Sequence, residues 1–473
     1  MHFVHNSFVL ITAFFCSLNT LSAQHQLPAK TFREQVQEEN DPMEAFFREG
    51  GLRYTFGEEG NAYIKFGVGS QFWVRHIWNN PGSTNVQGDT VARTFDVAMR
   101  RMRFSLTAHF ARRFTLYTQF GVNNQTFTSG GAYSPTGPDN KKPGMFIHDF
   151  WVKFPLLPEK LNFGIGLNAF NGVSRLTNVS YMFNFMLDNP TFNFPNIEHT
   201  DQIGRQLGFF AHGSLARLNY RFAYAKPFVY ADRQRDDPPV GRAVEVENER
   251  MAAKGYAYWQ FWDTEENLLP FTRMTYLGKK RILNVGAGFD YHPASTISLD
   301  TDGEEHFHNR LALGADVFLE LPTERGSAFN MYLVGYHYDY GPNFLRASGS
   351  MNISSGGFLE GEPLPQGGGN QQFILGTGNI VYASFGYLLH KPLLKSRGRL
   401  QPFYAYTYKN FEGLGTPSMQ HDLGLNYLLY GQHVKFSLQY SSRPIYRGSI
   451  GADARGDVVD SRGMLIFQAQ ITL

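Results

Sequence analysis

Residues 462–473, RGMLIFQAQITL, alternate between two faces of an extended strand. The apolar face carries Leu465, Phe467, Ala469, Ile471 and Leu473. The opposite face carries Met464, Ile466, Gln468, Gln470 and Thr472. A two-residue period at the end of a chain is typical of the strand that closes an outer-membrane β-barrel, with one face in lipid and the other in the lumen. On this segment alone, a buried C-terminal strand of a soluble sandwich is the alternative.

Composition favours the barrel. The 473 residues include 43 Phe, 25 Tyr and 48 Gly, yet only 42% are hydrophobic, and the mean hydropathy is −0.32. A barrel needs apolar residues on one face of each strand and aromatic girdles at both membrane interfaces, so it combines these values more easily than a soluble core does. The formal net charge of +2 gives no argument for a nucleic-acid partner.

The N-terminal residues are typical of an export signal. Residues 8–18, FVLITAFFCSL, form an apolar run that precedes small residues and a cleavage position after Ala23. We therefore expect a signal peptide over 1–23, a short periplasmic segment over 24–57 and an outer-membrane barrel over 58–473. Cys16 is the only cysteine and lies in the segment that we expect to be removed. No later stretch is long and apolar enough for a membrane helix.

Segments with a two-residue period recur from about residue 62 onward. We count about sixteen of them, each of about 9–14 residues, the length that a tilted strand needs to cross a bilayer. Short connections are expected near Ala111, 155–160, Gly213, 322–326 and Gly431. Long connections are expected near 79–92, 125–144, 169–201, 227–251, 291–307, 341–370 and 443–461. Two connections on the short side, 263–280 and 390–399, are longer than is usual there. The pattern predicts an all-β fold, a transmembrane antiparallel β-barrel of about 16 strands.

The third long connection has an unusual composition. Residues 169–201 read AFNGVSRLTNVSYMFNFMLDNPTFNFPNIEHTD. They include six aromatic residues, whose joint exposure to solvent on a free surface loop would be unfavourable. We therefore expect an inward-folded third extracellular loop that narrows the lumen. A loop that packs over the rim or against a neighbouring subunit is the alternative.

Three stretches resemble the phosphate-selective porin O and P type of Gram-negative bacteria. They are DVAMRRMRFSLTAHFARRFTLYTQFG (96–121), IHDFWVKFPLLPEKLNFGIGLNAF (147–170) and TDQIGRQLGFFAHGSLARLNYRFAYAKP (200–227). The similar pieces are a basic RRxRF strand, an aromatic strand that opens at Asp149, and an IGxxLG strand. The resemblance implies a 16-stranded barrel, a homotrimer and passive passage of small solutes. No lysine occurs from 161 through 225, so a lysine-rich phosphate site is not evident.

Charge that faces the lumen sets the ion preference of a narrow channel. The predicted pore-lining and constriction residues are Arg101, Arg103, Arg217 and Arg221 on the wall, with Arg175 and Asp188 on the inward loop. The strand phase changes between Met99 and Met102, which indicates a β-bulge at Arg100 and Arg101. For each arginine the alternative role is a structural hydrogen-bond network between wall and loop.

Other motifs are weak. Glu304, Glu305, His306 and His308 combine carboxylate and imidazole, but a solvated loop is the more typical reading, so no metal site is predicted. GxG pairs at 67/69, 164/166, 286/288 and 376/378 lack a third glycine and a helix, and we interpret them as points of curvature or packing space. His148 is predicted to face lipid.

We therefore expect an outer-membrane porin of a Gram-negative bacterium, a passive diffusion channel for small hydrophilic solutes, with anion or phosphate preference as the finer expectation. Its expected partners are outer-membrane lipids and lipopolysaccharide, small solutes or inorganic anions, and two further copies of the chain. No enzyme activity, cofactor or nucleic acid is expected. The alternatives are a non-conducting barrel, such as an adhesin or a secretion scaffold, and a rim-located hydrolase using His148 with Asp149 or His199 with Asp201.

Overall fold

A computed structural model describes residues 52–57, 61–110, 113–128, 144–190, 192, 204–227, 238–246, 248–390, 398–451 and 455–473. The expected signal peptide over 1–23 and most of the expected periplasmic segment over 24–57 lie outside these residues. In the described part of the chain, no helix has the length and apolarity needed to cross a membrane.

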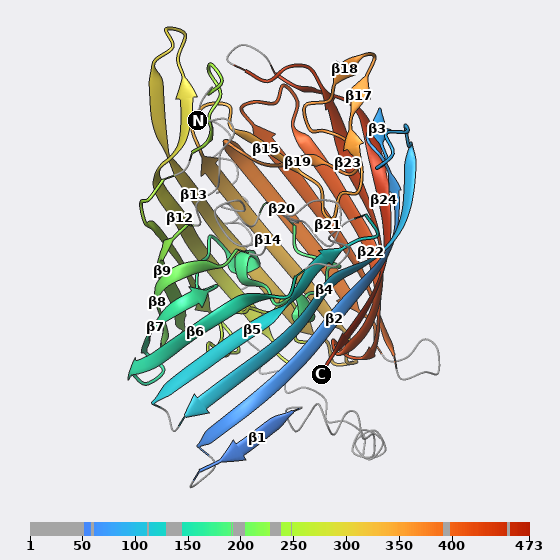
Figure 1. Ribbon diagram of the computed structural model, residues 1–473. Helices are drawn as coiled ribbons and strands as arrows, with labels where there is room; N and C mark the ends of the chain where they lie inside the picture. Colours follow the sequence, from blue (N-terminus) through green and yellow to red (C-terminus); the bar gives the residue numbers. More distant parts are fainter. Residues whose placement is uncertain are drawn as a thin grey trace.

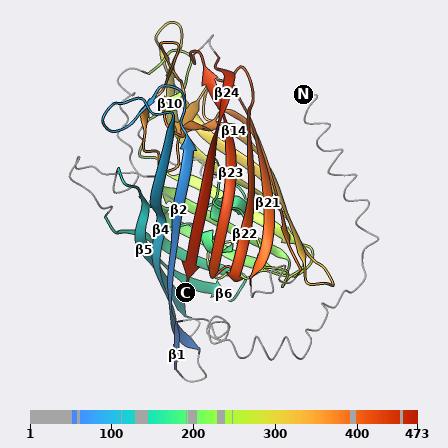
Figure 2. The same ribbon diagram turned by 90° about the vertical axis from the view of Figure 1, so that its right-hand side faces the viewer.

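Sixteen antiparallel strands close into a barrel (Figures 1 and 2). Each strand pairs with the next in the chain, and the last pairs with the first from Gly69 opposite Thr472 to Ile77 opposite Met464. The strands are β2 (Ala62–Trp78), β4 (Arg93–Phe110), β5 (Phe114–Gln125), β6 (Phe146–Leu157), β7 (Leu161–Asn168), β8 (Gln206–Leu215), β9 (Leu218–Lys226), β11 (Ala252–Gln260), β12 (Ile282–Leu299), β13 (Glu305–Pro322), β14 (Ala328–Asp339), β20 (Gly378–Leu388), β21 (Arg399–Phe411), β22 (Ser418–Tyr430), β23 (Val434–Arg447) and β24 (Asp457–Thr472). The prediction of an all-β barrel of about 16 strands is confirmed.

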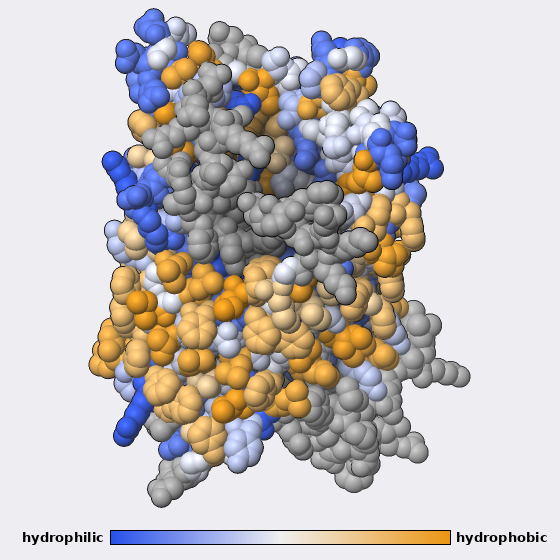
Figure 3. All heavy atoms as spheres, viewed as in Figure 1, coloured by the Kyte–Doolittle hydropathy of each residue, from blue (hydrophilic) through white to orange (hydrophobic). Residues whose placement is uncertain are grey.

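The two faces of each strand differ as the alternation predicts. On β24, Phe467 is 42% exposed on the outer surface, whereas Gln468 is fully buried on the inner one. Figure 3 shows the result on the visible face as a broad band of hydrophobic side chains across the barrel, with hydrophilic side chains concentrated toward one end. Apolar side chains on the outside and polar ones on the inside are the arrangement that a bilayer requires of a barrel wall.

The two ends of the barrel carry different connections. Long loops leave one end, here called the outer end, and mostly short turns leave the other, here called the inner end; in membrane barrels these face the outside and the periplasm. The described turns at 158–160, 216–217, 323–327 and 431–433 are short, as predicted. The long connection expected at 291–307 is wrong, because β12 continues to Leu299 and β13 starts at Glu305. A bulge between His292 and Thr296 interrupts the period there and hides the strand.

Short strands outside the sixteen of the barrel wall occur at both ends. At the inner end, β1 (Arg53–Phe56) pairs with the part of β2 that extends beyond the end of β24. Near the outer end, β10 (Val244–Glu245) pairs with β12. The loop over 340–377, here called L6, contains β15 (Leu345–Ser348), β16 (Ser355–Gly356), β17 (Phe358–Leu359), β18 (Glu362–Pro363) and β19 (Gln372–Gly376). Its β16 pairs with β3 (Ser83–Thr84) of the first loop, so the two loops are joined at the mouth.

Candidate channel interior

The third loop, here called L3 (169–205), lies inside the barrel over its described residues. Figures 1 and 2 show its short helices η2 (Arg175–Asn178) and η3 (Tyr181–Phe183) within the ring of strands. Its buried apolar side chains are Phe170, Val173, Leu176, Val179, Phe185, Met186, Leu187 and Phe192. Burial against the wall removes these apolar side chains from water, which stabilises the inward position of L3. Phe194, one of the six aromatic residues of the predicted loop, lies outside the described residues.

Side chains of the far wall form hydrogen bonds with L3, mostly with its backbone. The contacts come from β13, β14, β22 and β23, and each satisfies a polar group that the loop carries into the lumen. They join Asp316 to the N–H of Arg175 (2.6 Å), Tyr336 to the Ser174 hydroxyl (2.7 Å), Asn426 to the carbonyl of Phe185 (2.6 Å) and Lys435 to the carbonyl of Asn184 (2.7 Å). L3 therefore spans the lumen and is fixed to the wall on its opposite side.

Two glycines let L3 touch the wall directly. Gly288 on β12 and Gly314 on β13 are opposite each other in the ladder. A Cβ atom at these positions would lie 2.8 Å and 2.6 Å from the carbonyl oxygen of Val173, closer than real Cβ atoms approach. Gly288, one member of the GxG pair at 286/288, therefore has the packing role that we inferred from the sequence.

A β-bulge on β4 brings two arginines to one carboxylate. In the β2–β4 ladder Gln71 faces Arg101 and Phe72 faces Met99, so Arg100 is the inserted residue, as the sequence predicts. Arg100 Nε lies 2.8 Å and Arg101 Nη2 lies 2.9 Å from the two carboxylate oxygens of Asp188 on L3. Burial raises the pKa of Asp188, but the two guanidinium groups outweigh it and hold the pKa below its ordinary value. Asp188 is therefore ionised at neutral pH.

A second bulge, on β6, corrects one prediction. Gln119 faces Asp149 and Phe120 faces Ile147, so His148 is the inserted residue. His148 is fully buried, and the prediction that it faces lipid is wrong because the bulge changes the phase of the strand. Its neighbour Asp149 pairs with Arg205, which precedes β8, at 3.0 Å. The bulge therefore leaves Asp149 on the inner face of β6, beside Arg205.

The arginines around L3 exceed the carboxylates beside them. Arg103 donates to the carbonyl oxygen of Val122 at 3.0 Å and to the side chain of Asn123, so its contacts are neutral. Near it stand Arg100, Arg101 and Arg205, with Asp188 and Asp149 as the neighbouring acids. The guanidinium of Arg101 also lies over the ring of Tyr181 on L3, 5.5 Å from its centre. Arg100, Arg101, Arg103 and Arg205 are here called the arginine cluster. Two carboxylates lie beside these four guanidinium groups, so the cluster has a net charge of +2.

The excess of positive charge extends to the whole interior. Among the described residues, twelve arginines and lysines are buried over the whole residue, against seven aspartates and glutamates. The cations are Arg75, Arg101, Arg103, Lys153, Arg175, Arg205, Arg221, Lys254, Arg310, Lys409, Lys435 and Arg443. The acids are Asp96, Asp149, Glu245, Asp290, Asp316, Glu320 and Asp422. Adding the partly buried Arg100, Asp188 and Glu265 of the lumen brings these totals to thirteen and nine. Fixed positive charge in the interior of a channel generally raises the local concentration of anions.

A second segment enters the lumen from the inner end. This segment is the connection between β11 and β12, here called T4 (261–281), and its backbone pairs with that of L3. The N–H of Ser180 donates to the carbonyl of Thr272 (2.9 Å), the N–H of Thr272 to the carbonyl of Asn178 (2.8 Å), and the N–H of Met274 to the carbonyl of Phe183 (2.9 Å). Arg175 of L3 forms a buried ion pair with Glu265 of T4 and donates to the carbonyl of Arg273. Two segments from opposite ends of the barrel thus form one unit inside it.

L6 is attached to the barrel wall through two arginines. Arg75 on β2 donates to the carbonyl oxygens of Ser350 and Met351, both at 3.0 Å. Arg443 on β23 donates to the carbonyl of Gly369 at 3.0 Å. Both wall arginines therefore anchor the loop through its backbone carbonyl groups.

The structure places the predicted site residues as follows. Arg101, Arg103 and Arg221 are buried on the inner wall, and Arg175 and Asp188 lie on L3. Arg217 does not face the lumen: it lies in the turn between β8 and β9, is exposed, and donates to the carbonyl of Trp262 at 2.6 Å. That prediction is wrong because the alternation was extended across a two-residue turn. Sequence reasoning missed Arg205 and Glu265, although the unusual length of 263–280 is a signal for T4.

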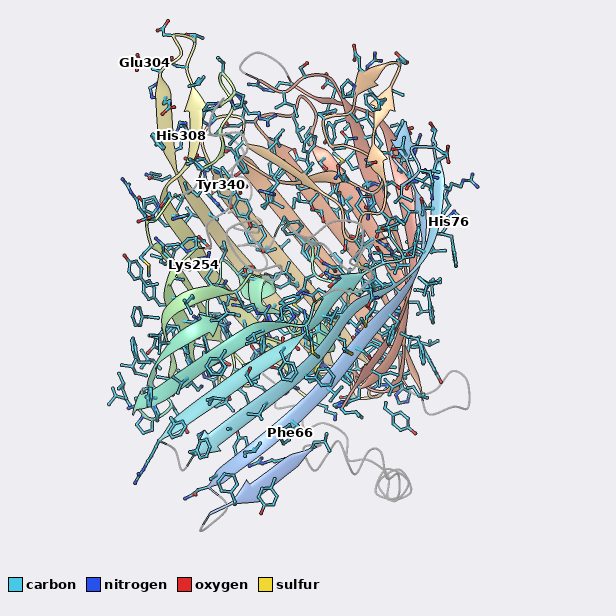
Figure 4. The ribbon with its side chains drawn as sticks, viewed as in Figure 1. Phe66, His76, Lys254, Glu304, His308 and Tyr340 are labelled. Carbon is cyan, nitrogen blue, oxygen red and sulfur yellow. The ribbon has the colours of Figure 1, made fainter. Side chains whose placement is uncertain are left out.

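The histidines and acids at 304–308 lie away from the lumen. Figure 4 shows Glu304 near the tip of the β12–β13 hairpin at the outer end, and His308 further down the same hairpin. His306 pairs with Asp300 at 2.9 Å, and both side chains are exposed. A solvated hairpin tip accounts for these residues.

Solved structures of three outer-membrane proteins are similar to this chain at low sequence identity. The structure of Pseudomonas putida OprB at high pH has a TM-score of 0.50 and 8% identity, covering 87% of this chain and 94% of that one. An anion-selective porin from Comamonas acidovorans has a TM-score of 0.47 and 11% identity, covering 87% and 100%. The outer membrane channel DcaP of Acinetobacter baumannii has a TM-score of 0.46 and 10% identity, covering 88% and 99%. No protein-family model and no curated protein sequence matches the chain. The similarity to OprB is one of fold, a closed antiparallel β-barrel.

Proposed function

We propose that this chain is an outer-membrane porin, a passive channel for small hydrophilic solutes that prefers anions. The observation that carries the proposal is the arginine cluster, which lies between the barrel wall and L3 with two carboxylates for four guanidinium groups. A fixed positive field at a constriction concentrates anions and repels cations. Inorganic anions, phosphate among them, are the solutes that this field favours.

The rest of the molecule supports the same proposal. The outer surface offers lipid an apolar band, and the inner wall carries the polar side chains (Figure 3). We infer export through the signal peptide over 1–23, a place in the outer membrane of a Gram-negative bacterium among phospholipid and lipopolysaccharide, and a homotrimer. The trimer rests on the resemblance of 96–227 to the O and P type porins.

A non-enzymatic role is part of the proposal. Of the two histidine–acid pairs considered for a hydrolase, His148 and Asp149 are fully buried on β6, where Asp149 is paired with Arg205. A rim hydrolase needs its general base within reach of substrate, and this pair lies inside the wall. His199 and Asp201 lie outside the described residues.

Conductance in planar bilayers tests the proposal. The refolded protein is inserted from detergent, and the reversal potential is measured in a KCl gradient. Stepwise currents whose reversal potential is displaced toward the equilibrium potential of chloride support an anion-preferring porin. Current steps in groups of three support the trimer. A folded barrel that passes no current would contradict the channel, and a reversal potential on the potassium side would contradict the anion preference.

A further inference from the structure

T4 is held in the lumen by L3 and by the wall. L3 is fixed to the wall by β13, β14, β22 and β23, and T4 lies between L3 and the inner end. The wall contacts of T4 include Glu320 on β13, which accepts hydrogen bonds from the N–H groups of Tyr276 and Gly278. Glu265 is the polar centre of the contact: it pairs with Arg175 of L3 and also accepts hydrogen bonds from Tyr276 of T4 and Asn284 of β12. A buried carboxylate with this many donors is stable only while its cationic partner stays in place.

T4 also covers cations of the wall. Lys153 on β6 donates to the carbonyl oxygen of Leu268, and Arg221 on β9 donates to that of Pro270. Both side chains are almost fully buried in this arrangement. Their partners in T4 are backbone carbonyls, so withdrawal of T4 would leave both positive charges on the lumen surface. Arg175 would lose Glu265 at the same time.

We propose that T4 is a gate at the inner end of the channel, held closed by the Arg175–Glu265 ion pair, and that its release both widens the lumen and exposes Lys153, Arg175 and Arg221 to the solute. The proposal rests on the channel function proposed above. Opening in this scheme changes two measurable properties together, because the segment that blocks the path also covers the charges.

The experiment compares Glu265→Gln with Asp290→Asn in bilayer recordings of the full chain. Glutamine keeps the shape of Glu265 and removes its charge, so the ion pair with Arg175 is lost. Asp290 pairs with Lys254 at 3.0 Å, and the two are ladder partners on neighbouring wall strands, β12 and β11 (Lys254 is labelled in Figure 4). Each substitution removes one buried carboxylate from the interior, but only the first touches the contact between T4 and L3.

The expected result is specific to Glu265. Glu265→Gln raises the open probability about tenfold or more, the change that loss of a buried ion pair produces in a two-state equilibrium, and moves the reversal potential further toward chloride. Asp290→Asn leaves the open probability unchanged and gives a smaller shift of the reversal potential. Equal behaviour of the two folded variants would overturn the gate and leave the channel standing.

A third variant separates the gate from the channel itself. Replacing 263–279 with a two-residue turn removes the gate entirely, and folding is checked by the retarded migration of unheated barrel on a denaturing gel. We expect this variant to conduct more than the wild type. If it is folded and passes no current, the channel function fails and the gate fails with it. If wild type and variant conduct equally, only the gate is overturned.

Discussion

Arg101 on β4 and Asp188 on L3 form an ion pair of 2.9 Å that joins the barrel wall to the loop crossing the lumen. Arg100 binds the same carboxylate from the other side, because the β4 bulge points both side chains inward. Asp188 therefore has two effects. It fixes the position of L3, and it offsets part of the positive field of the arginine cluster.

Asp188→Asn should separate these two effects. Loss of the carboxylate leaves Arg100 and Arg101 without their anion, so we expect the reversal potential in a KCl gradient to move toward chloride. It also weakens two charge-assisted hydrogen bonds, which should lower the stability of the folded barrel by about 2 kcal/mol. The stability is read from the temperature at which the compact gel band disappears. An unchanged reversal potential would show that the arginine cluster does not set selectivity.

Gly314→Ala should disturb L3 from the wall side. The added methyl group would meet the carbonyl oxygen of Val173 at 2.6 Å, so L3 must move or the wall must distort, at a cost of about 1–3 kcal/mol. We expect a changed single-channel conductance. Gly335→Ala on β14 is the matched control, since a Cβ there meets no atom within 4 Å. Identical conductance of both variants would argue against direct contact between L3 and β13.

Arg217 and Arg221 stand four residues apart in the sequence and should behave differently. Arg217 is exposed in the inner-end turn, so Arg217→Ala should leave the reversal potential unchanged and alter stability by no more than about 0.5 kcal/mol. Arg221→Ala should shift the reversal potential toward potassium, most clearly when combined with Glu265→Gln, because release of T4 exposes the arginine. A larger effect at Arg217 than at Arg221 would contradict the positions that the structure gives them.

Acid should open the gate. The groups around Glu265 are Arg175 of L3, Tyr276 and Lys280 of T4, Asn284 of β12, Tyr258 of β11, Arg221 of β9 and Glu320 of β13. Burial raises the pKa of Glu265, but Arg175 and the hydrogen bonds outweigh it, so the closed state lowers the pKa from its ordinary 4.5. The carboxylate therefore stabilises closure fully above pH 4.5, and this stabilisation is lost as the pH falls below that value.

The measurement is open probability between pH 7 and pH 3. The wild type should open more often below pH 4.5, whereas Glu265→Gln should lack this step. Glu320 accepts hydrogen bonds from the N–H groups of Tyr276 and Gly278, both at 2.6 Å, so it is the other carboxylate that holds T4. Glu320→Gln serves as the control. If the rise in open probability disappears in Glu320→Gln and persists in Glu265→Gln, the acid response belongs to Glu320 and the prediction for Glu265 is contradicted.

Much of the barrel was predictable because the bilayer imposes a simple rule on every strand. Phe467 outside and Gln468 inside follow from the two-residue period, as does the approximate strand number. Arg101, Arg103 and Arg221 were placed on the inner face by the same rule. The rule fails where the period is interrupted: it misplaced Arg217 at a turn and His148 at a bulge. A single inserted residue reverses the faces of everything beyond it.

The interior was less predictable, because its contacts join distant parts of the chain. Glu265 and Arg175 are 90 positions apart, and nothing in the composition of either segment specifies the other. The signal for T4 was its length, which a turn at the inner end does not need. Arg205 lies beside Asp149 only because β8 follows β7 in the ring, a relation that strand order supplies and local pattern does not.

The bulge at Arg100 has a consequence for how such a wall can evolve. Because the extra residue alone reverses the orientation of the side chains beyond it, deletion of one codon within β4 would exchange the lipid-facing and water-facing sets of that strand end in a single event. Point substitutions change the lining one side chain at a time. Short insertions and deletions inside strands therefore give this barrel a second, coarser route to a new interior, in which a whole row of charges appears or disappears at once.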